Sequence, residues 1–240
     1  MKILVLGHRG MLGHMVHKYL STKSNCELTI TDSRWPSERF KKKILDFDGD
    51  FVVNCIGAIH QKTNNFKVNT ELPIWLDELD KNFKIIHPGT DCEIDDDDYG
   101  DSKRISTEYL MKNNKNTKII KTSIIGHELD SKYSLLEWFL NSDSEVFGYS
   151  QAYWNGNTTL QWSKICYDLM VDWDNYEKLN IPSTECISKY ELLEKIKDVY
   201  DKDNVFIRKN SDVKVNKCLN GNINVPEIKE QLIQMREFYK

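Results

Sequence analysis

The sequence has 240 residues, of which 40% are hydrophobic and 29% charged, and its formal net charge is -4. A chain of this length buries one substantial core and carries a smaller lobe, which argues against two full independent domains. Lysine and arginine are interleaved with aspartate and glutamate, so no basic face indicates a nucleic-acid partner. Small-molecule chemistry is the better expectation.

The first half of the chain alternates short apolar runs with segments of helical spacing. The runs predict strands at 2–6, 27–31, 51–55, 83–87 and 118–122, and the segments between them predict helices at 11–20, 37–45, 69–79 and 103–111. Ser37 or Asp32 is the expected cap of the second helix. Strands that alternate with helices form right-handed crossovers, so we expect an α/β fold with a doubly wound parallel sheet.

The second half is less regular. We expect helices at 134–140, 158–171 and 189–200, an irregular stretch at 148–157, short strands near Asn180 and Val205, and a last helix that ends at Tyr239 with Pro226 as its first residue. These segments predict a small substrate-binding lobe over about residues 151–240, beside a cofactor-binding domain over 1–150, with some interleaving.

The six cysteines are scattered along the chain: Cys26, Cys55, Cys92, Cys166, Cys186 and Cys218. Because they form no C-x-x-C pair and no histidine cluster accompanies them, we expect reduced, buried, structural cysteines and no bound metal. The apolar segment 1–6 is followed at once by His8 and Arg9, too early for a signal peptide or a membrane span. We therefore expect a cytoplasmic protein without a membrane partner.

A glycine-rich turn follows the first predicted strand. Its G-x-x-G-x-x-G pattern comprises Gly7, His8, Arg9, Gly10, Met11, Leu12 and Gly13. Glycines at a strand-to-helix junction permit a tight turn and let backbone N–H groups approach a pyrophosphate at the helix N-terminus. The pattern predicts that Gly7 and residues 9–13 bind a dinucleotide; alternatively, the turn only connects strand and helix.

Asp32 stands about 20 residues beyond the turn, where an acid accepts hydrogen bonds from the adenosine ribose of NAD. Arg34 is suited to the 2′-phosphate of NADP instead. Asp32 has an alternative role as a turn residue that caps the next helix. We expect an NAD(P) cofactor, with NADP(H) slightly favoured over NAD(H).

Tyr99 and Lys103 are four residues apart and therefore share one helix face. A neighbouring lysine cation favours the phenolate, so we expect it to move the pKa of Tyr99 from about 10 toward a range useful in acid–base catalysis. Thr90 closes the predicted strand 83–87 and Asn54 lies at the tip of the strand 51–55, at the sheet edge where ligands collect. Alternatively, Tyr99 and Lys103 are an exposed pair on a helix surface without a catalytic role. For Asn54, the alternative is that it serves only to hydrogen-bond the turn that follows its strand.

Taken together, these residues resemble the dTDP-4-dehydrorhamnose reductase family among the extended short-chain dehydrogenases, which use this spacing of glycines. The resemblance extends along the chain through the segments 54–57, 68–70, 89–92, 122–126, 135–139, 154–159 and 187–192. It implies a Rossmann-type cofactor domain, with Asn54, Cys55, Ile56 and Gly57 beside the cofactor. It also implies that Tyr99 donates a proton to a C4 carbonyl, that Thr90 orients this carbonyl and that Lys103 holds the nicotinamide ribose.

By the same resemblance, Trp154 and Asn155 line the substrate pocket; core packing is the alternative for Trp154. The expected reaction is NAD(P)H-dependent reduction of a nucleotide-linked 4-keto-6-deoxy sugar, in deoxysugar and surface-glycan biosynthesis. The sequence leaves a homodimer open.

Two features depart from the family pattern. Related dehydratases place an acid pair directly after the catalytic threonine, whereas here Cys92 follows Asp91, which disfavours dehydration. The usual flap between threonine and tyrosine is reduced to residues 91–98, although nine extended steps still span about 30 Å. The aspartates at 95–98 are expected to face solvent. A non-catalytic NADP-binding regulatory subunit and a sugar-nucleotide epimerase remain as alternatives.

Overall fold

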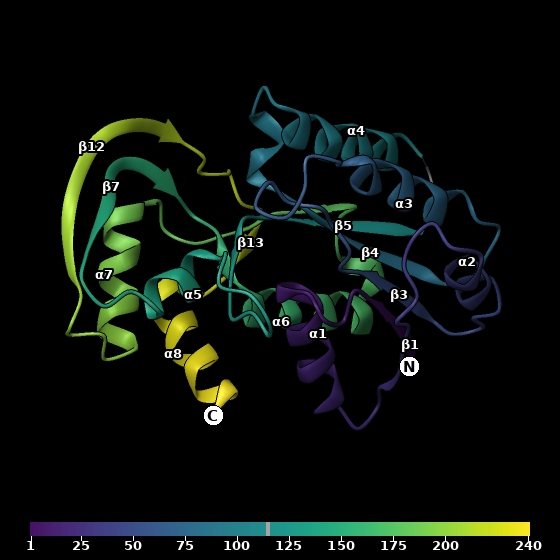
Figure 1. The fold of residues 1–240 in the computed structure, drawn as a ribbon. Coiled ribbons are helices and arrows are strands. Elements are labelled where there is room, and N and C mark those ends of the chain that lie inside the picture. Colours follow the sequence, from purple (N-terminus) through teal and green to yellow (C-terminus); the bar gives the residue numbers. More distant parts are fainter. Residues whose placement is uncertain (114–115) are drawn as a thin grey trace. The chain divides into compact units, whose positions relative to one another are not determined.

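The computed structural model describes residues 1–113 and 116–240, and a six-stranded parallel sheet organises its first part (Figure 1). The strands are β1 (Lys2–Leu6), β2 (Glu27–Ile30), β3 (Phe51–Asn54), β4 (Lys84–Gly89), β5 (Thr117–Lys121) and β9 (Leu179–Asn180). They lie in the order β2-β1-β3-β4-β5-β9, and all neighbours are parallel. The strand order reverses between β1 and β3, and open α/β sheets bind ligands at the carboxyl ends of strands at such a point.

Helices follow the first four strands: α1 (Met11–Ser21), α2 (Glu38–Leu45), α3 (Lys67–Glu78) and α4 (Asp98–Lys112). Residues 3–6 of β1 have no exposed surface, as expected for a parallel strand covered on both faces. Phe40 and Ile44, four residues apart on α2, pack into the same apolar cluster as Leu4 and Leu6. Ser37 caps α2, since its hydroxyl accepts a hydrogen bond from the Phe40 N–H (3.3 Å).

The chain divides into two units. The N-terminal unit consists of Met1–Lys121 and Ser163–Asn180, and the C-terminal unit of Thr122–Trp162 and Ile181–Lys240. The expected division at residue 150 differs from these bounds. The chain leaves the N-terminal unit after β5 and returns through α6 (Thr159–Val171) because β9 completes the sheet beside β5.

A three-stranded sheet and three helices form most of the C-terminal unit. The strands β7 (Glu145–Trp154), β11 (Ile187–Ser188) and β12 (Phe206–Asn216) lie in the order β11-β7-β12, and the helices are α5 (Leu135–Leu140), α7 (Lys189–Val199) and α8 (Ile228–Tyr239). Two short parallel pairs, β6 (Ile124–Ile125) with β8 (Asn157–Thr158) and β10 (Pro182–Ser183) with β13 (Ile223–Asn224), complete it. The 3-10 helices η1 (Asp91–Ile94) and η2 (Trp173–Asn175) belong to the N-terminal unit.

The structure corrects three sequence-based expectations in the C-terminal unit. The stretch 148–157 was expected to be irregular, but β7 continues through it to Trp154, with buried and exposed residues alternating along the strand. A glycine and several polar residues interrupt the apolar pattern, so the sequence signal for this strand is weak. Helix α8 begins at Ile228 with Glu227 as its N-cap, so Pro226 precedes the helix. The strand near Val205 is not short, since β12 continues to Asn216 along β7.

Two of the cysteines expected to be reduced form a disulfide. Cys186 and Cys218 are bonded, with 5.8 Å between their Cα atoms. Strands β11 and β12 both pair with the end of β7, Ile187 opposite Trp154 and Asn216 opposite Tyr153, and this pairing brings the two sulfurs together. Of the other four cysteines, Cys166 alone is fully buried. Across the described ranges, no helix is both long and apolar enough to span a membrane.

Candidate active site

The glycine turn after β1 is tight and depends on its glycines. Gly7 has a φ of +76°, in the left-handed region that favours glycine, and its carbonyl accepts a hydrogen bond from the Gly10 N–H (2.9 Å). A Cβ on Gly13 would lie 2.1 Å from the Gly7 oxygen, so no side chain fits there. The glycines therefore let α1 begin directly against the end of β1.

The N-terminus of α1 fits the pyrophosphate of a dinucleotide. Its N-cap, Gly10, has no side chain to bond the first N–H groups of the helix, and the first turn contains no acidic residue. The N–H groups of Met11 and Leu12 and the positive end of the helix dipole are suited to an anion at this position. Leu12 itself is buried, so its backbone rather than its side chain is available to a ligand.

Asp32 lies beside the turn and contacts Arg9 and His8 from it. Its Oδ1 is 2.8 Å from Nη2 of Arg9 and 3.5 Å from Nε2 of His8. The Asp32 side chain is 66% exposed, and exposed ion pairs of this kind contribute little to stability, so a cofactor can displace them. Arg34 is exposed. Because Ser37 caps α2, the alternative role of Asp32 as that cap is wrong.

The segment after β3 is held as a turn against the glycine turn. The buried side chain of Asn54 accepts a hydrogen bond from the Ile56 N–H (3.1 Å) and donates one to Nδ1 of His87 on β4 (3.1 Å). The Cys55 N–H donates to the Leu6 carbonyl (3.0 Å), and burial raises the pKa of the Cys55 thiol. Atoms of Cys55 and Ile56 would contact a Cβ on Gly7, so the two turns meet; Gly57 is exposed.

Thr90, Tyr99 and Lys103 come together at the carboxyl end of β4. Thr90 directly follows β4, and its buried hydroxyl lies near the phenol of Tyr99 in the first turn of α4 and donates to Oδ1 of Asp91 (3.1 Å). The Lys103 ammonium, one turn later and 6% exposed, donates to the Pro88 carbonyl of β4 (2.7 Å). The Tyr99 ring packs against Phe66, with 5.7 Å between ring centroids. The structure therefore places a hydroxyl, a phenol and an amine within one small region of the N-terminal unit.

The pKa of Tyr99 is shifted in the direction opposite to the sequence-based expectation. Burial raises it, and the negative charges of Asp91 and Glu93 raise it further. Burial also lowers the pKa of Lys103 to about 8, which Glu93 partly opposes. Desolvation is the largest cause of the rise because the Tyr99 side chain is largely removed from water, so the phenol stays protonated near neutral pH.

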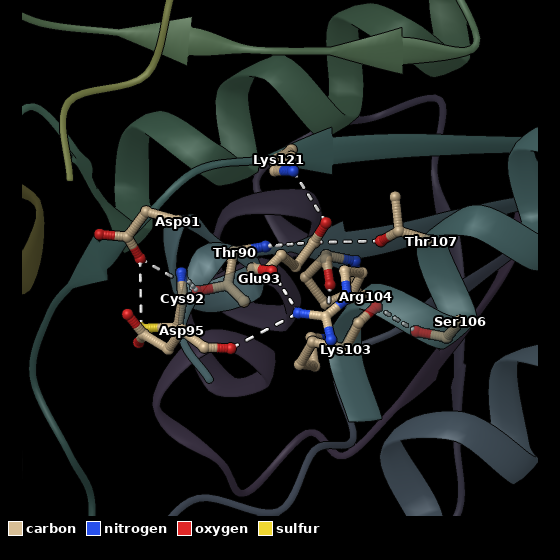
Figure 2. A network of polar contacts seen from close by, with 11 residues as sticks. Thr90, Asp91, Cys92, Glu93, Asp95, Lys103, Arg104, Ser106, Thr107 and Lys121 are labelled. Atoms are coloured by element: carbon tan, nitrogen blue, oxygen red, sulfur yellow. Dashed lines mark hydrogen bonds and ion pairs between the residues drawn. The ribbon is translucent and has the colours of Figure 1, made fainter. Parts of the chain in front are cut away.

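Glu93 is a buried polar residue that the sequence-based assignment of the site missed. Figure 2 shows its carboxylate between Thr90, Thr107 and Lys121. Oε1 accepts hydrogen bonds from the Thr90 N–H and the Thr107 hydroxyl, both at 3.0 Å, and Oε2 is 2.8 Å from the Lys121 ammonium. Thr90 and Glu93 form a capping box on η1. Their Thr-x-x-Glu spacing is the sequence signal that predicts such a box.

The shortened connection from β4 to α4 is ordered by local hydrogen bonds. Helix η1 fills its first half, and Asp97 caps α4 by accepting a hydrogen bond from the Gly100 N–H (2.7 Å). The guanidinium of Arg104 donates to the carbonyls of Glu93 (3.0 Å) and Asp95 (3.4 Å). The aspartates at 96–98 are exposed, as expected, while Asp95 is half-buried.

Trp154 and Asn155, the expected substrate contacts, are packed inside the C-terminal unit. Trp154 is 1% exposed, which favours its alternative role in the core, and the Lys189 ammonium lies 4.8 Å from its ring centroid. Asn155 bonds the backbone of Leu219 at both ends of its amide, as donor and as acceptor, at 2.8 Å each. Asn155 therefore holds the loop after β12 within its own unit. Among the described residues, no three His, Cys, Asp or Glu side chains are placed to hold a metal ion.

Comparison with known proteins gives matches in structure and none in sequence. No family model and no curated protein sequence matches the chain. A dTDP-4-dehydrorhamnose reductase from Clostridium acetobutylicum superimposes with a TM-score of 0.76 at 18% identity, covering 100% of this chain and 99% of its own. The chain has the dTDP-4-dehydrorhamnose reductase fold.

The same reductase from Bacillus anthracis, in complex with NADP, has a TM-score of 0.76 at 12% identity, with 98% of both chains covered. A dTDP-glucose 4,6-dehydratase from B. anthracis, in complex with NAD, has a TM-score of 0.73 at 13% identity, covering 100% of this chain and 96% of its own. The expected doubly wound, Rossmann-type sheet is therefore confirmed, and the dTDP-4-dehydrorhamnose reductase fold spans both units.

Proposed function

We propose that this protein is an NAD(P)H-dependent reductase of a nucleotide-linked 4-keto-6-deoxy sugar. The observation that carries the proposal is the position of Thr90, Tyr99 and Lys103 at the end of β4, in a sheet whose first turn fits a dinucleotide pyrophosphate. The fold shared with sugar-nucleotide reductases supports the substrate class.

Each of the three side chains has a role that follows from its surroundings. Tyr99 is held as a neutral phenol by burial and donates its proton to the C4 carbonyl oxygen of the substrate. Thr90, whose hydroxyl lies near that phenol, orients the same oxygen. Lys103 holds the nicotinamide ribose and contributes positive charge near the phenolate that forms. A bound reduced nicotinamide supplies the hydride.

The cofactor we propose is NADP(H), with NAD(H) as the competitor. Arg9 lies beside Asp32, and Arg34 follows two residues later, so positive charge predominates near the expected adenosine ribose. A 2′-phosphate would pair with these cations in place of Asp32. The alternative is that Asp32 keeps its position and accepts hydrogen bonds from the ribose hydroxyls of NAD.

We assign cofactor binding to the N-terminal unit and substrate binding to the C-terminal unit. We place the enzyme in the cytoplasm and its reaction in deoxysugar biosynthesis. A regulatory subunit that binds NADP without turnover and a sugar-nucleotide epimerase are the competing functions. The epimerase is kept because a UDP-N-acetylglucosamine 4-epimerase from Bacillus cereus shares the fold, with a TM-score of 0.65.

The direct test is to add NADPH or NADH to the purified protein with a panel of 4-keto nucleotide sugars, and to follow the absorbance of the reduced nicotinamide. We expect oxidation of NADPH that depends on the sugar and yields the 4-hydroxy product. Tight NADPH binding without turnover on any substrate would favour the regulatory subunit. Interconversion of 4-epimers without net cofactor oxidation would favour the epimerase.

A further inference from the structure

Glu93 connects three elements behind the proposed catalytic side chains. It belongs to η1, and its carboxylate bonds the Thr90 N–H at the end of β4, the Thr107 hydroxyl on α4 and the Lys121 ammonium at the end of β5. Two threonines and one lysine thus share a single carboxylate. Any movement of Glu93 would change the position of Thr90 relative to α4, which also carries Tyr99.

The burial of Glu93 makes these contacts obligatory. The side chain is 4% exposed, and an isolated carboxylate in such a place is strongly disfavoured. Lys121, 18% exposed, supplies the opposite charge, and the two 3.0 Å hydrogen bonds satisfy the remaining oxygen. Each oxygen of the carboxylate therefore has a partner, and the side chain is held in place.

The residue before Thr90 leaves room for this carboxylate. A Cβ on Gly89 would lie 3.1 Å from Oε1 of Glu93 and 3.0 Å from the Lys121 Cβ, so a larger residue would press on both. Gly89 and Glu93 therefore fit each other.

The charge of Glu93 acts on both titratable groups of the proposed site. It raises the pKa of Lys103 against the effect of burial, and it adds to the rise in the pKa of Tyr99. His87 on β4 also lies near Lys103, and burial lowers its pKa well below 6.5, so it adds no negative charge there. Glu93 is thus the negative charge that supports the Lys103 ammonium.

We propose that Glu93 is a positioning residue, which holds Thr90 in place for Tyr99 and sets the electrostatic surroundings of Lys103. It touches no reacting atom and acts through Thr90 and Lys103. The proposal rests on the function proposed above, in which these two residues and Tyr99 carry out the reduction.

The test uses Glu93→Gln, Glu93→Asp and the double variant Glu93→Gln/Lys121→Met. The double variant guards against a folding defect, because it removes the carboxylate together with the cation that would be left unpaired. Glu191→Gln is the matched control: Glu191 forms the same kind of capping box with Ser188, at the start of α7 in the C-terminal unit.

Three quantities are measured on each folded variant: kcat, KM and the pH at which the Lys103 amine titrates, followed by competitive acylation and mass spectrometry. We expect Glu93→Gln and the double variant to lower kcat by about tenfold or more, to change KM little and to shift the titration of Lys103 to lower pH. Glu93→Asp keeps the charge but is too short to reach the Thr90 N–H, so it should lower kcat without that shift. Glu191→Gln should leave all three quantities unchanged.

An unchanged titration of Lys103 in both folded Gln variants overturns the inference, whether or not the wild-type protein turns over. So does an unchanged kcat in an active enzyme. Absence of turnover in the wild-type protein would instead contradict the proposed function, and the titration of Lys103 would still decide the electrostatic role of Glu93.

Discussion

The two units use their buried polar side chains in different ways. In the N-terminal unit, Asn54, Thr90 and Lys103 lie at the carboxyl ends of β3 and β4, around a phenol and beside a helix N-terminus suited to an anion. In the C-terminal unit, Asn155 bonds the backbone of Leu219 in the loop after β12, and Gln231 bonds the Pro226 carbonyl just before α8, where peptide groups lie outside regular strands. Buried polar residues therefore indicate chemistry only when they surround a reactive group; elsewhere they hold irregular chain together.

The largest expected effect of a single substitution is the loss of turnover in Tyr99→Phe, in the N-terminal unit. This variant removes the proposed proton donor but keeps the ring that packs against Phe66 and His60. We expect turnover to fall by about 100- to 10,000-fold, with NADPH affinity and thermal stability nearly unchanged. Steady-state kinetics and a fluorescence titration with NADPH check this. Turnover within about tenfold of the wild type would remove Tyr99 from the mechanism.

In the C-terminal unit, the largest expected effect is on stability. Replacing Cys186 by Ser opens a loop closed over a sequence separation of 32 residues, which should lower the free energy of unfolding by about 3–4 kcal/mol. Cys26→Ser, at a half-buried free cysteine, is the control. Denaturant titration measures the difference, and a thiol count on the unfolded, unreduced protein should give four rather than six. Six thiols would show that the disulfide is absent.

Asn155→Ala separates packing from substrate contact. The variant loses both hydrogen bonds to Leu219 in a buried position and should destabilise the protein by about 1–3 kcal/mol. Thermal unfolding measures this loss, and NADPH affinity should not change. If instead stability is kept and KM for the sugar nucleotide rises, Asn155 contacts the substrate directly.

The smallest expected effect is a pH dependence that belongs to the N-terminal unit. Because burial lowers the pKa of Lys103 from 10.5 to about 8, kcat/KM should fall as the pH rises through about 8 and the ammonium is lost. The same shift makes the unfolded chain bind more protons than the folded protein between these values, so this group makes stability rise with pH there. A pH–rate profile tests the first point. Lys103→Arg should abolish the fall near pH 8, and an unchanged profile would contradict the assignment.

Sequence reasoning succeeded where one short pattern determines one structure. The run 2–6 and the glycines at 7, 10 and 13 define β1 and the turn, since a buried parallel strand and a positive φ each demand particular residues. The pattern Tyr-x-x-x-Lys placed Tyr99 and Lys103 on one helix face, and Thr90, expected at the same sheet edge, lies near Tyr99.

It failed where long-range packing decides. The disulfide depends on the pairing of β11 and β12 with the same end of β7, which no local pattern encodes. The pKa shift of Tyr99 depends on burial, and the lysine spacing alone predicts the wrong direction. Glu93 had a local signal, its capping box with Thr90, but its pairing with Lys121 joins residues from different strand ends.

The return of residues 163–180 to the first sheet has a consequence for synthesis of the chain. Since β9 pairs with β5 only after the intervening segment 122–162 has been made, the sheet cannot be completed while the ribosome is still translating that segment. Until then β5 is an open edge, the kind of surface on which nascent chains associate wrongly. A fragment that stops near residue 150 would keep that edge permanently, so expression of the cofactor-binding part alone requires residues up to Asn180.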